Sequence, residues 1–384
     1  MSNNTQPEIR FPGFTEDWEQ RKAKELFIPK AEKNQPELPV LSVTQDHGVV
    51  YREQVGIDIK YDKATLKNYK VIHQGDFVIS LRSFQGGFEL SDKLGITSPA
   101  YTIFVPKNMD SQDNLFWKTK FKTFTFIESL KTVTFGIRDG KSISFSEFGD
   151  LKLFFPKNIE EQQKIGAFFK QLDDTIALHQ RKLDLLKETK KGFLQKMFPK
   201  NGAKVPEIRF PGFTEDWEER KLGDITKIST GKLDANAMVE NGKYDFYTSG
   251  IKKYRIDVAA FEGPSITIAG NGATVGYMHL ADNKFNAYQR TYVLQEFLVD
   301  RSFIFSEIGN KLPKKIKQEA RTGNIPYIVM DMLTELKLSI PQNNSEQQKI
   351  GNFFKQLDDT ITLHQRKLDL LKEMKKGFLQ KMFV

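Results

Sequence analysis

The sequence predicts an α+β protein in which two strand-rich α/β domains alternate with two long helices that pair with each other. Two internal repeats carry this prediction. Residues 161–198 recur at 346–383 with three differences over 38 positions, and residues 7–19 recur unchanged at 206–218. The stretches between the repeats are rich in Phe, Tyr, Val and Ile and share little sequence with each other. The chain is therefore two tandem units, each with an opening segment, a variable domain and a long helix.

The long repeat predicts the helix pair because its apolar residues are spaced by alternate steps of four and three. Such a 3.5-residue period, held for about four heptads, is typical of a coiled-coil seam, since it keeps one narrow face toward a partner helix. The predicted seam residues are Ile165, Phe169, Leu172, Ile176, His179, Leu183 and Leu186 in the first copy, and Ile350, Phe354, Leu357, Ile361, His364, Leu368 and Leu371 in the second. The two histidines occupy equivalent positions, and we interpret them as buried polar residues that fix the register rather than as metal ligands.

Each helix is predicted to begin with a capping box after a proline, with Asn158 three residues before Glu161 and Asn343 three before Glu346. Pro199 and the glycine at 202 end the first helix. The resulting divisions are 1–156, the first opening segment and variable domain; 157–204, the first helix and linker; 205–341, the second opening segment and variable domain; and 342–384, the second helix.

Inside the variable domains, short apolar runs between Gly, Asn and Asp turns predict strands. The predicted strands are Pro39–Thr44, Asp76–Leu81, Ala100–Val105 and Leu151–Phe155 in the first domain, and Ser265–Ala269, Gly276–Leu280, Thr291–Gln295 and Leu336–Ile340 in the second. The acidic opening segments carry aromatic residues, among them Trp18 and Trp217, which we interpret as packing straps on a neighbouring surface.

Composition limits the setting and the partners. The 384 residues carry a formal net charge of +9, which favours a polyanionic partner. There is no cysteine, so disulfides and thiolate metal sites are excluded. Neither a signal-peptide pattern nor an apolar run of about 18 residues is present, so we expect a cytoplasmic protein with no membrane contact.

Arg, Gln, Asn and Lys side chains in the predicted loops are the candidate DNA contacts. Arg with Gln or Asn can read base edges through paired hydrogen bonds, whereas lysines mostly hold phosphates. The candidates are Arg82, Ser83, Gln85, Arg138 and Lys141 in the first domain, and Asn271, Thr274, Tyr288, Gln289, Arg290, Lys314, Lys315 and Arg321 in the second. Each alone is an ordinary surface residue, but as a set they favour nucleic-acid contact.

Two stretches resemble cofactor-binding motifs but lack the spacing that those motifs require. Residues 136–142 resemble a phosphate-binding loop but have three residues between their glycines where four are required. Residues 269–277 miss the third glycine of a dinucleotide fingerprint by one place and suit a tight hairpin better. The five histidines lack metal-ligand spacing, so we expect no catalytic residue and no bound metal.

Two unlike domains alternating with two near-identical helices, a Glu-Gln-Gln-Lys-Ile helix start after a proline, and the lead-in from Trp217 to Asp224 resemble the specificity subunit of Type I restriction–modification systems. This resemblance covers essentially the whole chain. It implies that each variable domain is a target-recognition domain for one half of a split DNA sequence. It also implies an antiparallel helix pair with pseudo-twofold symmetry, which acts as a spacer.

The same resemblance implies the partners. Double-stranded DNA, two modification (methyltransferase) subunits and restriction (endonuclease) subunits would assemble on the chain, with adenine methylation and DNA cleavage supplied by those subunits. S-adenosylmethionine, ATP and Mg would then be bound by the partners and no cofactor by this chain. Two alternatives stay open, a coiled-coil scaffold joining two protein-binding modules and an enzyme with an unrecognised site.

Overall fold

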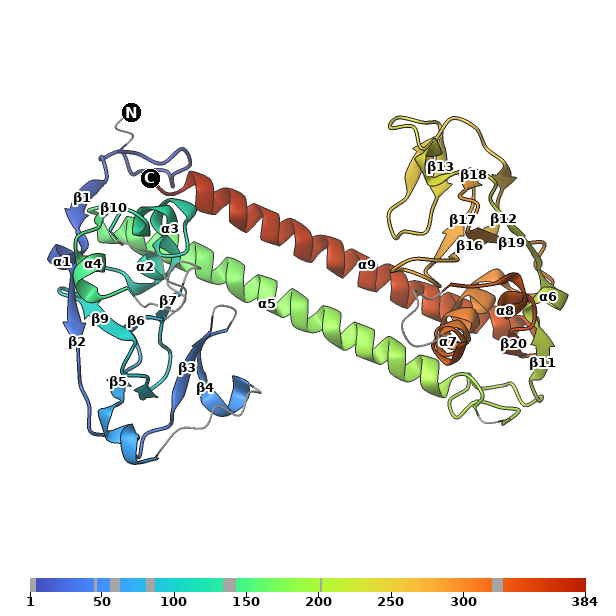
Figure 1. Cartoon of the computed structure of the whole chain (residues 1–384), viewed down its shortest axis with the longest axis horizontal. Coiled ribbons are helices and arrows are strands. Elements are labelled where there is room, and N and C mark those ends of the chain that lie inside the picture. The colour runs from blue at the N-terminus through green and yellow to red at the C-terminus, as the bar shows by residue number, and fades with distance from the viewer. Residues whose placement is uncertain are drawn as a thin grey trace. The chain divides into compact units, whose positions relative to one another are not determined.

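The computed structural model describes residues 5–44, 47–55, 63–80, 87–133, 143–200, 202–319 and 327–384. Contacts divide the chain into two compact units. Unit 1 contains Met1–Gln180 together with Lys367–Val384, and unit 2 contains Arg181–Arg366. Each unit therefore combines one variable domain with the beginning of one long helix and the end of the other (Figure 1).

The long helices are α5 (Ile159–Lys196) and α9 (Asn344–Lys381), each of 38 residues. Inside each unit the segments of α5 and α9 run antiparallel, and equivalent side chains join them. The contacts are Phe168–Phe378 (5.1 Å between ring centroids) and Asp173–Lys375 (2.5 Å) in unit 1, and Phe193–Phe353 (5.0 Å) and Lys190–Asp358 (2.5 Å) in unit 2. The repeated sequence thus makes the same helix–helix contacts twice, which confirms the antiparallel pairing.

Unit 1 is centred on an antiparallel sheet with the strand order β2-β9-β6-β7, accompanied by the pairs β3-β4, β5-β8 and β1-β10. Apolar side chains of this sheet pack against short helices to form an aromatic core, in which Phe27, Phe77 and Phe104 are fully buried. The strands are β1 (Glu19–Lys22), β2 (Phe27–Lys30), β3 (Leu41–Thr44), β4 (Gly48–Tyr51), β5 (Lys70–Ile72), β6 (Phe77–Ile79), β7 (Phe88–Leu90), β8 (Gly95–Thr97), β9 (Thr102–Pro106) and β10 (Lys152–Phe155).

Unit 2 repeats this topology with other side chains. Its main sheet has the order β12-β19-β16-β17, its second sheet the order β14-β13-β18-β15, and β11 pairs with β20. Taken in chain order, β12 to β19 correspond to β2 to β9. The strands are β11 (Glu218–Lys221), β12 (Lys227–Thr230), β13 (Tyr244–Tyr247), β14 (Tyr254–Ile256), β15 (Phe261–Glu262), β16 (Ser265–Ala269), β17 (Met278–Ala281), β18 (Lys284–Ala287), β19 (Thr291–Gln295) and β20 (Lys337–Ile340).

Further helices among the described residues complete both units. In unit 1 they are α1 (Ala23–Leu26), η1 (Arg52–Val55), η2 (Lys63–Asn68), α2 (Asn114–Lys120), α3 (Phe124–Leu130) and α4 (Phe145–Gly149). In unit 2 they are α6 (Leu222–Ile225), η4 (Ala235–Ala237), α7 (Arg301–Glu319) and α8 (Met330–Thr334). Helices α2 and α7 are equivalent: each directly follows an Asp whose main-chain N–H donates to a buried glutamine of a long helix, Asp113 to Gln162 (3.0 Å) and Asp300 to Gln347 (2.9 Å).

The opening segments are packing straps, as predicted. Trp18 is buried against Phe116 and Phe383, so the first strap covers the end of α9. Trp217 is buried in the same way against Phe198, beyond the end of α5. The two repeats of the strap therefore hold equivalent helix ends, one in each unit.

The capping-box prediction is half wrong. Asn158 Oδ1 does accept a hydrogen bond from the Glu160 N–H (2.8 Å), so the asparagine caps the helix. The Glu161 carboxylate, however, accepts two hydrogen bonds from the Arg10 guanidinium, at 2.6 and 2.8 Å. Arg209 and Glu346 repeat this arrangement in unit 2. A charged side chain from the strap offers the glutamate a stronger partner than one main-chain N–H.

All eight predicted strands occur, with bounds shifted by one or two residues in six of them. Ser265–Ala269 and Thr291–Gln295 agree with β16 and β19 at both ends. The predicted helix segments start two residues later than α5 and α9 and end two residues later.

Candidate nucleic-acid interface

Several of the sequence candidates fall on equivalent connections of the two units. The β6–β7 connection of unit 1 corresponds to the β16–β17 connection of unit 2, and both carry candidates. The α3–α4 and α7–α8 connections correspond in the same way. Six of the candidates lie outside the described residues, and they are Arg82, Ser83, Gln85, Arg138, Lys141 and Arg321.

In unit 2 main-chain hydrogen bonds gather several loops into one cluster. Gly270 lies at its centre, because its N–H donates to Arg290 O (2.8 Å) and its carbonyl accepts from the Ile328 N–H (2.7 Å). Asn271 forms a β-bridge with Tyr327, and a Cβ placed on Gly276 would lie 2.8 Å from the Ile316 side chain of α7. The β16–β17 connection, the β18–β19 turn, the segment after residue 326 and the end of α7 therefore lie together.

The described candidates divide by exposure. Gln289 and Arg290 are exposed on the β18–β19 turn, where they are free of the sheet's packing, while Tyr288 is half-buried. On α7, Lys314 is exposed and donates to Asn310 Oδ1 (3.3 Å), and half-buried Lys315 forms an ion pair with Glu319. Arg290 and Gln289 have the exposure and chemistry that base-edge contacts require.

Asn271 and Thr274 face inward. The Ser249 hydroxyl donates to Asn271 Oδ1 (2.5 Å), and the Thr274 hydroxyl donates to the Ser249 carbonyl. Both side chains therefore hold the β13–β14 connection, residues 248–253. Sequence reasoning passed over that connection, although its two consecutive lysines, Lys252 and Lys253, were an available signal.

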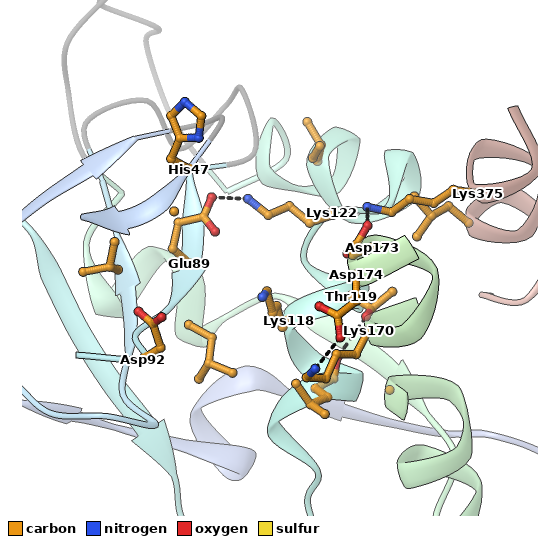
Figure 2. A pocket seen from close by; sticks show the side chains of 17 residues that line it. His47, Glu89, Asp92, Lys118, Thr119, Lys122, Lys170, Asp173, Asp174 and Lys375 are labelled. Atoms are coloured by element: carbon orange, nitrogen blue, oxygen red, sulfur yellow. Dashed lines mark hydrogen bonds and ion pairs between the residues drawn. The ribbon is translucent and has the colours of Figure 1, made fainter. Parts of the chain in front are cut away.

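Unit 1 contains a polar groove of about 710 Å³ between the β3–β4 hairpin, β7, α2 and the helix pair (Figure 2). Three ion pairs line it: Lys122 with Glu89, Lys170 with Asp174, and Lys375 with Asp173. Burial raises the pKa of the Glu89 carboxyl, and the charge of Lys122 opposes that shift. Since four lysines and four Asp or Glu carboxylates line it, the groove is a surface of balanced charge rather than an anion pocket.

The predicted seam residues differ in burial along the helices. Buried members are Ile165, Phe169, Leu183, Ile350, Phe354 and Leu368, and half-buried members are Leu172, Ile176, His179, Leu186, Leu357, Ile361, His364 and Leu371. Ile165 and Phe169 belong to the core of unit 1, and Ile350 and Phe354 belong to that of unit 2. These four side chains therefore fasten the helices to the variable domains.

Within the described ranges, no group of three or more His, Cys, Asp or Glu side chains is arranged to hold a metal ion. Over the same residues, no helix has both the length and the apolar character to cross a membrane. The chain is therefore a duplicated, two-domain protein. Its two units share the same strap, sheet topology and long helix but carry different loops.

Comparison with known proteins identifies the family. The model described as "Type I restriction modification DNA specificity domain" matches residues 15–188 and 214–373. The chain therefore belongs to this family of DNA specificity subunits and carries its specificity domain twice.

Individual relatives agree with this assignment. The EcoDI specificity subunit of Escherichia coli is 34% identical over 165 residues, which is 43% of this chain and 36% of that relative's length. The MjaVIII specificity subunit of Methanocaldococcus jannaschii is 24% identical over 364 residues, covering 84% of this chain and 81% of the relative. A crystal structure of a type I S subunit from M. genitalium has the same fold, with a TM-score of 0.72 at 17% identity over 99% of both chains.

Proposed function

We propose that each variable domain reads one half of a split, asymmetric DNA target, while the helix segments and straps dock two modification subunits. The observation that supports this proposal is the combination of unlike loops with a repeated framework. Equivalent strands carry different loop sequences in the two units, whereas the helix contacts and the strap–helix ion pairs are the same. Different loops suit two different half-sites, and identical frameworks suit two copies of one partner.

In this proposal the chain contributes recognition and no catalytic group. The modification subunits bind S-adenosylmethionine and methylate adenine at N6, which requires the base to leave the duplex stack. Restriction subunits, when they join, use ATP and Mg to cleave DNA. Exposed Arg290 and Gln289 read base edges of the second half-site, and Lys314 lies near phosphates.

Co-expression with a candidate modification subunit in a host free of adenine methylation tests the proposal. Mapping of N6-methyladenine across the host genome should give one motif of two separated halves. If a stable complex forms but methylates nothing, its binding to a library of random DNA duplexes is measured next, at several salt concentrations. Affinity that falls steeply with salt supports DNA recognition, whereas salt-independent, negligible retention identifies a protein scaffold and refutes the proposal.

A further inference from the structure

The β13–β14 connection, residues 248–253, is held by side chains from a different part of unit 2. Ser249 donates its hydroxyl to Asn271 Oδ1 and accepts the Thr274 hydroxyl on its carbonyl. Both partners come from the β16–β17 connection, more than 20 residues away along the chain. Two hydrogen bonds to one residue fix the base of the loop on the loop cluster described above.

His279 of β17 supports the loop from beneath. Its Nε2 lies 3.3 Å from the Gly250 carbonyl, which can only accept, so Nε2 carries the proton of this bond. The imidazole also contacts the rings of Tyr247 and Tyr277, with ring centroids 5.1 and 4.9 Å away. The loop is therefore held by hydrogen bonds at both Ser249 and Gly250, so its tip is presented in a defined position.

The tip of the loop is exposed and has a distinct chemistry. Ile251 is 59% exposed, although it is a large apolar side chain. Lys252 and Lys253, which follow it, are also exposed, and their ammonium groups lie 5.3 Å from the ring centroids of Tyr254 and Tyr247. Cations held over aromatic rings are restrained in position. An apolar side chain beside two restrained cations matches a duplex groove, where phosphates flank base edges and thymine methyl groups.

We propose that residues 248–253 form a specificity element of the second domain. Ile251 contacts base edges, Lys252 and Lys253 contact the flanking phosphates, and Asn271 and Thr274 are positioning residues that hold the loop. This inference rests on the proposed function, because it assigns a further part of the same DNA interface. It also reassigns Asn271 and Thr274 from base contacts to supports.

Selection of bound duplexes from a random library, using the full-length chain in complex with its modification subunit, tests this assignment. Ile251→Ala should lower affinity for the selected site about fivefold, as expected for losing roughly one buried apolar contact, and should lose sequence information in one half of the motif only. Lys252→Ala and Lys253→Ala should each leave the motif unchanged and reduce the salt slope by about 1. Leu298→Ala, at an apolar position outside the loop that is at least as accessible (69% exposed), is the matched control and should change neither property.

Thr274→Val and Thr274→Ser separate positioning from general stability. Valine removes the hydroxyl that donates to Ser249, so discrimination in the same half of the motif should fall, and serine should restore it. If Ile251→Ala and Thr274→Val both select the wild-type motif with undiminished information, the loop is not a specificity element. If the wild-type complex selects no motif, the proposed function itself fails, and that result is distinct from the preceding one.

Discussion

The ion pair between Arg209 and Glu346 joins the second strap to the start of α9. The guanidinium donates to both carboxylate oxygens, at 2.7 and 2.8 Å, and the Glu346 side chain is fully buried. The hydrogen bond with Glu346 is also the main reason that the pKa of Arg209 is raised. Arg209→Met would keep most of the side-chain volume and leave a buried carboxylate with no compensating charge.

The expected loss of stability depends on whether the Glu346 carboxylate of the variant stays ionised or takes up a proton. If it stays ionised, loss of one partner of a buried pair costs about 3–5 kcal/mol. If it takes up a proton at pH 7, the cost is about 3.7 kcal/mol, because each pH unit above the ordinary glutamate pKa of about 4.3 is worth about 1.36 kcal/mol. Arg209→Met should therefore lower the free energy of unfolding of unit 2 by about 3–4 kcal/mol.

Hydrogen exchange read by mass spectrometry, peptide by peptide, measures this loss in unit 2. Arg10→Met removes the equivalent pair with Glu161 and is the matched variant for unit 1. The double variant Arg209→Met with Glu346→Gln should recover much of the loss, since no buried charge remains unpaired. A loss below about 1 kcal/mol for Arg209→Met, or a double variant as unstable as the single one, would refute this reasoning.

Three further outcomes are expected. Burial raises the pKa of the Glu307 carboxyl to about 7, so wild-type stability should fall as the pH rises from about 4.5 through 7. In denaturation experiments at pH 5 and pH 8, Glu307→Gln should remove this pH dependence and raise the free energy of unfolding at pH 8 by on the order of 3 kcal/mol. An unchanged pH dependence contradicts this assignment. Gly351→Ala should destabilise the protein by about 1–3 kcal/mol, because the added Cβ would lie 2.6 Å from the Phe303 nitrogen. Gly377→Ala has open space around its Cβ and should stabilise α9 by up to about 1 kcal/mol. Equal effects of the two variants on thermal unfolding would contradict the packing argument. Arg290→Ala should relax one half of the methylation motif without changing the unfolding midpoint, and uniform weakening across all sequences would mark it as a phosphate contact.

The long helices were predictable because their signal is local and periodic. A 3.5-residue apolar spacing specifies a helix with one apolar face before any tertiary contact is known. It does not specify the partner of that face, because Ile165 and Phe169, like Ile350 and Phe354, pack in the core of a variable domain. Strands such as β16 and β19 were predictable for a similar reason, since each is a short apolar run between turns. By contrast, β1 and β11 have the sequences EQRK and EERK, which carry no apolar strand pattern. They form strands because β10 and β20 pair with them, and that is information from elsewhere in the chain.

The positions of the interface loops were predictable from the sequence, but the roles of their side chains were not. Polar residues beside glycines pointed to the β16–β17 connection and to the β18–β19 turn, and exposed Gln289 and Arg290 lie there as free side chains. The inward roles of Asn271 and Thr274 depend on Ser249, which lies more than 20 residues away along the chain and is near them only in the folded structure. Side-chain direction at a loop is decided by such distant partners, so composition alone could not supply it.

Exchange of one variable domain tests the central claim most directly. Residues 20–156 would be replaced by the variable domain of another member of the family, and N6-methyladenine would be mapped in cells that express the exchanged chain with its modification subunit. The account predicts a motif in which one half is new and the other half is unchanged. A motif that changes in both halves, or in neither, would contradict the assignment of one half-site to each domain.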